Sequence, residues 1–142
     1  MIPGSDQRYY LGTMSGTSMD GLDIAAVDFS SAQQPRLLQT GFIAYPDDLK
    51  RALQSLVADP RASISELCQL DSRLGQFYAT ALNQFIKDHQ LDKQHISAVG
   101  SHGQTIRHRP HADKPFSLQL GNGQRIADLT EGIVDLSKLQ GF

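Results

Sequence analysis

The segment GTMSGTSMDGLD, Gly12 to Asp23, decides how the first part of this chain folds. It combines glycines, hydroxyl side chains and two aspartates, and it contains no lysine or arginine. An apolar run precedes it and the sequence IAAVDF follows it. Two apolar runs on either side of a glycine-rich polar segment are typical of two strands joined by a turn. We therefore expect a hairpin whose turn is longer and more polar than a simple chain reversal needs.

Four interpretations of this turn are considered, and the first three are a P-loop, a protease nucleophile segment and a plain turn. The G-x-x-x-x-G spacing of Gly16 and Gly21 matches a P-loop, but Leu22-Asp23 stand where Lys-Ser/Thr is required, which excludes that motif. The sequence GTSM is similar to the nucleophile segment of subtilisin-type proteases, with Ser18 as the nucleophile. Its place near the start of the chain argues against a triad ordered Asp, His, Ser. A plain turn built on Asp-Gly remains open.

The fourth interpretation is a phosphate-binding turn. Glycines allow successive backbone amides to face one anion, and Ser15, Thr17 and Ser18 add hydroxyl donors. Asp20 and Asp23 are compatible with a polyphosphate only when a cation lies between them. Mg²⁺ is the natural bridge, because it binds phosphate oxygens and water together with a few carboxylates. On this interpretation Asp20 and Asp23 hold Mg²⁺, through water.

The composition indicates a globular chain that works in a reducing compartment. The sequence has 142 residues, 39% hydrophobic and 20% charged, with a formal net charge of -2, enough for one domain with a core. The charge argues against nucleic acid as a partner. One cysteine, Cys68, allows no intrachain disulfide, and we expect a packed or half-exposed thiol. The sequence shows neither a signal peptide nor an apolar run of about 20 residues, so we expect a cytoplasmic chain without a membrane partner.

Hydrophobic periodicity predicts an α/β fold whose mixed sheet opens with antiparallel hairpins and is flanked by helices. Strands are expected over residues 9–12, 22–29, 36–46, 96–105 (running into a loop) and 117–121, with a bulge at Gly41. A short helix opens at Pro46-Asp47-Asp48 and stops before Pro60. A longer one has a capping box of Ser63 and Glu66 and runs to about Asp88. A third runs from Asn122-Gly123 through Leu129, and Gly132 stops it.

A second polar segment, GSHGQT, follows the strand that begins near residue 96. Donors and acceptors gather there beside Gly103, which suits a ligand rich in hydroxyl groups, although a loop that satisfies its own hydrogen bonds remains open; they are Ser101, His102, Gln104 and Thr105. The histidines at 102, 108 and 111 match no common zinc spacing. Arg107 and Arg109 are expected either to meet a phosphate or carboxylate or to be solvated.

Three segments resemble the signatures of the anhydro-N-acetylmuramic acid kinases, a family of bacterial sugar kinases. They are MSGTSMDGLD, GSHGQTIRHRP over residues 100–110 and SLQLGNGQRIADLT over residues 117–130, and they occur in the family's order and at about its spacing. The resemblance covers residues 9–130. It implies a ribonuclease H-like domain, part of a two-lobe kinase in the superfamily of actin, heat-shock chaperones and sugar kinases.

The resemblance also implies ligands and a reaction. By position, the ATP-binding segment comprises Gly16, Thr17, Ser18, Met19, Asp20, Gly21, Leu22 and Asp23. The substrate side comprises Ser101, His102, Gln104 and Thr105. The implied reaction uses ATP, Mg²⁺ and water: water opens the 1,6-anhydro bridge of anhydro-N-acetylmuramic acid while O6 takes the γ-phosphoryl group. The product is N-acetylmuramic acid 6-phosphate, which is salvaged in cell-wall recycling.

The resemblance weakens after Thr130. The family continues there with a valine-rich strand and an Asp-Phe-Arg segment that carries the catalytic base, whereas this chain reads EGIVDLSKLQGF. Asp135 lacks the flanking residues, so no catalytic residue is assigned. We therefore expect a flexible leader over 1–8, an incomplete amino-terminal lobe over 9–130 and an atypical tail over 131–142. The alternative function is an inactive nucleotide-binding or interaction module. Surfaces that a second lobe would cover predict a homo-oligomer.

Overall fold

The computed structural model describes residues 8–31, 33–59 and 61–130. Most of the expected leader and the whole of the expected tail, including Gly132 and Asp135, lie outside the described residues. The statements below concern the described part of the chain.

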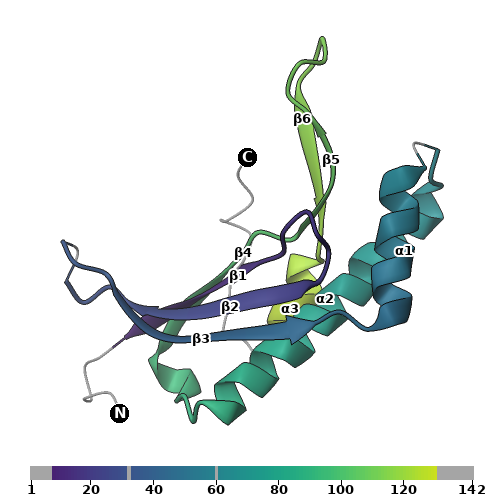
Figure 1. Ribbon diagram of the computed structural model, residues 1–142. Helices are drawn as coiled ribbons and strands as arrows, with labels where there is room; N and C mark the ends of the chain where they lie inside the picture. Colours follow the sequence, from purple (N-terminus) through teal and green to yellow (C-terminus); the bar gives the residue numbers. More distant parts are fainter. Residues whose placement is uncertain (1–7, 32, 60, 131–142) are drawn as a thin grey trace.

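A four-stranded mixed sheet forms the centre of the fold (Figure 1). Its strands are β1 (Tyr9–Met14), β2 (Gly21–Asp28), β3 (Arg36–Ala44) and β4 (Ile96–Ser101), in the order β3-β2-β1-β4. Strands β1, β2 and β3 form an antiparallel meander, and β4 lies parallel to β1. The expected mixed α/β class, with a sheet that opens on antiparallel hairpins, is confirmed.

Strand periodicity gives the sheet one buried face and one open face. Along β1, Tyr9 and Leu11 are buried whereas Tyr10 and Met14 are exposed. Successive side chains of a strand point to opposite faces, so the buried residues of β1 and β2 share one face. That face packs against the helices in a single hydrophobic core.

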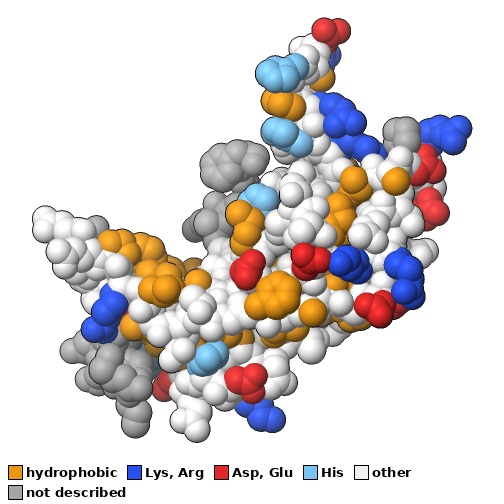
Figure 2. Space-filling model, viewed as in Figure 1, with side chains coloured by type: hydrophobic (Ala, Val, Ile, Leu, Met, Phe, Trp, Pro, Cys, Tyr) orange, Lys and Arg blue, Asp and Glu red, His pale blue; other side chains and the backbone are white. Residues whose placement is uncertain are grey.

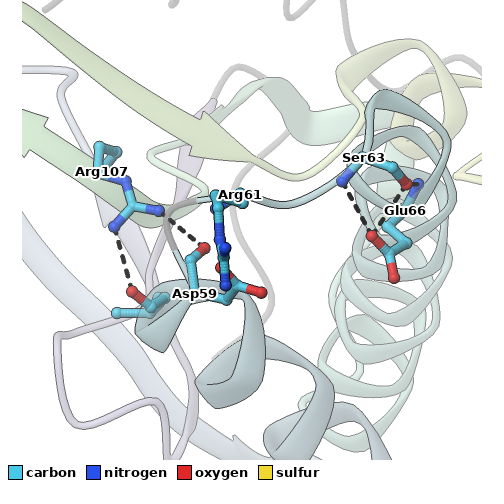
Figure 3. Close-up of polar contacts among 6 residues, drawn as sticks. Asp59, Arg61, Ser63, Glu66 and Arg107 are labelled. Atoms are coloured by element: carbon cyan, nitrogen blue, oxygen red, sulfur yellow. Dashed lines mark hydrogen bonds and ion pairs between the residues drawn. The ribbon is translucent and has the colours of Figure 1, made fainter.

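Three α-helices accompany the sheet: α1 (Asp47–Ala58), α2 (Ile64–Asp88) and α3 (Gly123–Leu129), with a short 3₁₀ turn over Lys93–His95 (Figure 1). The capping box predicted at the start of α2 is confirmed (Figure 3). The Ser63 Oγ accepts the Glu66 amide at 3.1 Å, and the Glu66 Oε2 accepts the Ser63 amide at 2.9 Å. The Ser63 hydroxyl also donates to the Glu66 Oε2 at 2.9 Å, and the donations from the Ser63 amide and hydroxyl lower the pKa of the Glu66 carboxyl, because they favour its charged form.

The bulge expected at Gly41 is wrong. Gly41 pairs regularly with Ile24, and the register of β2 and β3 shifts instead between Ala26 and Val27. A Cβ at Gly41 would lie 2.9 Å from the Cδ2 of Phe85. The glycine therefore provides room for an aromatic ring of α2 to pack against the sheet, and the backbone needs no irregularity there.

The strand expected to begin at Ile96 and run into a loop is confirmed, but the loop is only the turn at His102-Gly103, and the second strand that starts at Gln104 was not predicted. Strand β4 ends at Ser101, and β5 (Gln104–Arg109) pairs with β6 (Phe116–Leu120) in a separate antiparallel hairpin. Gly103 has a φ of 75°, and a Cβ there would lie 2.5 Å from the Leu120 carbonyl oxygen. This backbone conformation redirects the chain, so that the hairpin projects away from the sheet (Figure 1).

Large hydrophobic side chains remain exposed on the sheet and the hairpin (Figure 2). They include Tyr10, Met14, Phe29, Leu37 and Phe42 from the sheet region, and Phe116 and Leu118 from the hairpin. Cys68, which was expected to be packed or half-exposed, is exposed on α2. Among the described residues, no helix is both long and apolar enough to cross a bilayer.

Gly21, the first residue of β2, and Gly12, within β1, provide a matched test of how closely β2 packs against β3. A Cβ at Gly21 would lie 2.3 Å from the Ile43 carbonyl oxygen, whereas a Cβ at Gly12 would meet nothing within 4 Å. We expect Gly21→Ala to lower the free energy of unfolding by about 1–3 kcal/mol, because the β2 and β3 backbones must move apart. Gly12→Ala should change it by no more than about 0.5 kcal/mol. Urea denaturation of both variants measures the difference, and equal losses would contradict the packing described.

Candidate functional site

The β1–β2 turn presents its first residues to solvent. Gly16, Thr17 and Ser18 are exposed, while Ser15 and Met19 on either side of them are buried. The Met19 amide donates to the Gly16 carbonyl at 3.2 Å, and Met19 has a φ of 55°. A non-glycine residue in the left-handed region needs local compensation, which here is the burial of its side chain. The turn is therefore fixed at both ends and open in the middle.

The remaining residues of the expected ATP-binding segment occupy different environments. Asp20 is exposed at the end of the turn. Gly21 and Leu22 begin β2, and the Leu22 side chain is fully buried in the core. Asp23 is exposed and lines the cleft described below. The side chain of Leu22 thus serves the packing of the hairpin, while the exposed turn and Asp23 are accessible to a ligand.

Lys50 supplies the positive charge that the turn itself lacks. Its Nζ lies 2.7 Å from the Asp20 Oδ1, and the Tyr45 amide donates to the Asp20 carbonyl at 2.9 Å, which places the start of α1 beside the turn. The hydrogen bond from Lys50, followed by one from Ser18, lowers the pKa of the Asp20 carboxyl. Sequence reasoning missed Lys50 because it considered only residues within the motif, and no local pattern indicates which residue of a later helix reaches it.

The two proposed metal ligands do not form a preformed metal centre. Asp20 is paired with Lys50, and Asp23 lies on β2 at the cleft. Within the described ranges, no three histidine, cysteine, aspartate or glutamate side chains are grouped as metal ligands. This arrangement fits an ion such as Mg²⁺ that arrives with a polyphosphate and keeps several waters, because such an ion needs only one or two protein carboxylates.

A cleft of about 1220 Å³ lies between the open sheet face and the β5–β6 hairpin. Asp23, Ser101 and His102 line it together, so the structure brings one acid of the first motif to the same cleft as two residues of the second. The Ser101 Oγ is buried and has no hydrogen-bond partner among the described residues. His102 is exposed, with its Nδ1 3.1 Å from the Gly103 carbonyl oxygen. Thr105 lies in β5, opposite Gln119, and is not among the lining residues.

Gln104 lies away from this cleft, in a buried polar cluster. Its side chain is 1% exposed. Its Oε1 accepts the Tyr45 hydroxyl at 3.1 Å, and its Nε2 donates to the Gly16 carbonyl at 3.1 Å. The Tyr45 hydroxyl also contacts the Ser15 Oγ at 2.6 Å and the Tyr78 hydroxyl at 2.9 Å. We call Ser15, Tyr45, Tyr78 and Gln104 the tyrosine cluster; it connects the β1–β2 turn to the start of β5.

The other polar residues considered from the sequence have structural partners. Arg107 donates to the carbonyls of Val57 and Asp59 at 3.2 and 3.3 Å, at the carboxyl end of α1 (Figure 3). A cation at that end of a helix satisfies carbonyls that lack helical partners. Arg109 is exposed and donates to the neighbouring His108 carbonyl. His108 contacts the Ser117 Oγ at 2.6 Å across the hairpin.

Comparison with known proteins identifies the family. The family model of anhydro-N-acetylmuramic acid kinase matches residues 8–140. The chain is 41% identical over 121 residues to the anhydro-N-acetylmuramic acid kinase of Actinobacillus pleuropneumoniae serotype 5b, an alignment that covers 85% of this chain and 32% of the relative. For the kinase of the same name from Colwellia psychrerythraea, the identity is 42% over 127 residues, covering 89% of this chain and 32% of the relative.

The kinase from Pasteurella multocida is 39% identical over 122 residues, covering 86% of this chain and 32% of the relative. The chain therefore spans about a third of the length of the curated relatives it matches. The family predicted from the three sequence motifs is confirmed: the chain belongs to the anhydro-N-acetylmuramic acid kinase family.

Proposed function

We propose that this chain is the nucleotide-binding part of a sugar kinase that acts on anhydro-N-acetylmuramic acid. The observation that carries the proposal is the exposed turn Gly16–Ser18 at the junction of β1 and β2, next to a cleft that Asp23, Ser101 and His102 line. Relatives that align with most of this chain are named for that kinase activity. The strand order β3-β2-β1-β4, with β4 parallel to β1 and the others antiparallel, supports a ribonuclease H-like lobe.

The turn binds the phosphates of ATP through its backbone amides and hydroxyl groups. Gly16 and the exposed Thr17 and Ser18 provide donors without side chains that block approach. Lys50 adds a positive charge beside Asp20. Mg²⁺ would neutralise phosphate charge when bound with the nucleotide, and Asp23, which lines the cleft, would hold one of its waters. The positive electrostatic field that attracts the phosphates thus comes from the backbone amides, Lys50 and the ion together.

The cleft binds the sugar. The Ser101 Oγ, which has no hydrogen-bond partner among the described residues, and the exposed His102 offer hydrogen bonds to hydroxyl groups of the sugar. In the proposed reaction, water adds at C1 as the 1,6-anhydro bond breaks, and O6 takes the γ-phosphoryl group, which leaves ADP and N-acetylmuramic acid 6-phosphate. The whole reaction belongs to a protein of the relatives' length.

A second candidate function is a nucleotide-binding or interaction module without turnover. The sequence contains no Asp-Phe-Arg segment, and the described residues place no further carboxylate beside Asp23 in the cleft. A general base must lie within hydrogen-bond reach of the water that it activates. We propose that this chain alone binds nucleotide but transfers phosphate slowly or not at all.

A titration with Mg·ATP tests nucleotide binding directly. We expect the backbone amide NMR signals of residues 16–23 to shift, while those at the far ends of β1 and β2 stay in place. A parallel phosphotransfer assay with anhydro-N-acetylmuramic acid separates the two candidate functions, since only the kinase releases ADP in a sugar-dependent manner. Unmoved signals in the turn at millimolar Mg·ATP would refute the proposal.

Replacement of Lys50 tests its electrostatic role. Lys50→Met should weaken Mg·ATP binding roughly fivefold at low salt, because one positive charge near the phosphates contributes about 1 kcal/mol in a watery site. Lys87→Met, in the last turn of α2, is the matched control and should leave the affinity unchanged. The difference should shrink at high salt, where exposed charges are screened. Calorimetry measures the affinities, and identical values for the two variants would exclude a role for Lys50.

The exposed apolar side chains of the sheet support self-association. Leu37 is 60% exposed and Phe42 is 55% exposed, and both lie on β3, an edge strand of the described sheet. Sheet edges and apolar faces of this kind favour pairing between copies. We propose a homo-oligomer at micromolar concentration, which sedimentation velocity would detect. Leu37→Glu should shift the distribution towards monomer, whereas a wild-type chain that sediments as a monomer throughout would contradict the proposal.

A further inference from the structure

We infer that Gln104 is a positioning residue for the phosphate-binding turn: it directs the Gly16 carbonyl inward and so presents the Thr17 amide to an anion. The inference rests on the proposed function, and it assigns Gln104 a role different from the sugar contact that the sequence suggests. It follows from the place of Gln104 in the tyrosine cluster, beneath the turn and out of the cleft.

The orientation of the Gln104 amide is fixed by its two partners. The Gly16 carbonyl can only accept, so the group 3.1 Å from it must be the Nε2. The reversed amide would place two carbonyl oxygens in contact, and its NH₂ would face the Tyr45 hydroxyl instead. Because Gln104 is 1% exposed, water cannot relieve that mismatch. The side chain therefore has one stable orientation.

The tyrosine cluster supplies the matching donor. The Gln104 Oε1 needs a proton, and the Tyr45 hydroxyl lies 3.1 Å away. The same Tyr45 hydroxyl also donates to the Ser15 Oγ at 2.6 Å, and the Tyr78 hydroxyl lies within hydrogen-bond distance of both Tyr45 and Ser15, at 2.9 and 2.7 Å. Burial raises the pKa of both tyrosines, so these hydroxyl groups keep their protons. A continuous chain of hydrogen bonds thus begins at Ser15 and returns, through Gln104, to Gly16.

The contact between Gln104 and the Gly16 carbonyl also determines where the Thr17 N–H points. In a trans peptide, the carbonyl of one residue and the amide of the next point to opposite sides. The structure has no cis peptide among its described bonds. Since Gln104 directs the Gly16 carbonyl towards the buried cluster, the Thr17 N–H points away from it. Both Thr17 and Ser18 are exposed, so this amide is available to a ligand.

The position of Gln104 is set by the hairpin rather than by the turn. It is the first residue of β5, and it pairs with Leu120 of β6. The preceding Gly103 packs so closely on the Leu120 carbonyl that a Cβ would lie 2.5 Å from it. The segment that contributes Ser101 and His102 to the cleft therefore also fixes the residue beneath the phosphate-binding turn. The two sides of the proposed site share one structural element.

NMR of the ligand-free chain tests the positioning. In Gln104→Met, the amide signals of Thr17, Ser18 and Met19 should shift and the Thr17 amide should broaden, because the Gly16 carbonyl loses the Gln104 Nε2 as a donor and keeps the Met19 amide. Tyr45→Phe keeps the bond from Gln104 to Gly16 and should cause smaller shifts in the turn. Thr130→Val removes a buried hydrogen bond in α3, 2.8 Å long, and is the control for a loss of stability alone. It should leave the turn signals in place.

Binding measurements then connect the turn to the nucleotide. Gln104→Met should bind Mg·ATP and Mg·tripolyphosphate roughly fivefold to tenfold more weakly than the wild type, as expected for one misdirected donor. An equal loss of affinity for Mg·ATP and Mg·tripolyphosphate would show that Gln104 acts on the binding of the phosphates and not on that of the nucleoside. If Gln104→Met does not fold, Gln104→Leu, which also lacks a donor to the Gly16 carbonyl, takes its place. The same loss of affinity is expected for it.

The outcomes separate the two proposals. Unmoved turn signals in the Gln104 variants, or unchanged affinity for both phosphate ligands, would overturn the inference. A wild-type chain that fails to bind Mg·ATP would refute the proposed function and the nucleotide role of Gln104 with it. In that case, shifted turn signals in ligand-free Gln104→Met would still establish that Gln104 determines the conformation of the turn.

Discussion

The buried hydrogen bonds beneath the β1–β2 turn determine the geometry on which the rest of the site depends. Ser15, Tyr45, Tyr78 and Gln104 come from the turn, from the residue after β3, from α2 and from β5. A buried polar group without a partner costs about 1–3 kcal/mol, so four such groups are tolerated only when they satisfy one another. Each of the four segments must therefore adopt its observed position for the others to remain paired.

Further contacts place the β5–β6 hairpin relative to the helices. The Asp71 Oδ1 of α2 accepts the Gly121 amide at 2.8 Å, and its Oδ2 accepts the Asn122 side chain at 3.0 Å. These bonds hold the end of β6 and the start of α3 against α2. At the other side, Arg107 of β5 contacts the last carbonyls of α1. The hairpin thus has a defined orientation without being part of the central sheet, and this orientation places Gln104 under the turn.

The sequence predicted the elements that depend on local patterns. The hairpin around Gly12–Asp23, the capping box at Ser63 and the end of α2 at Asp88 follow from short-range rules, and the structure confirms them. It did not predict features that depend on distant partners. The Phe85 ring leaves no room for a side chain at Gly41, and the Leu120 carbonyl leaves none at Gly103. Lys50 of α1 forms an ion pair with Asp20 of the turn. Composition and spacing do not encode these tertiary contacts, so Gln104 was interpreted as a ligand residue rather than a buried one.

The cleft owes its depth to small residues that lie side by side on the open face of the sheet. Gly12 of β1 pairs with Ala25 of β2 on one side and with Gly100 of β4 on the other. A Cβ at Gly12 would meet nothing within 4 Å, so its hydrogen faces open space rather than packed atoms. Glycine weakens a strand, because it restricts the backbone less and has no side chain to pack. At Gly12, packing does not require the glycine, so its loss of strand stability has another reason; an open floor beneath the cleft is consistent with the proposed sugar site.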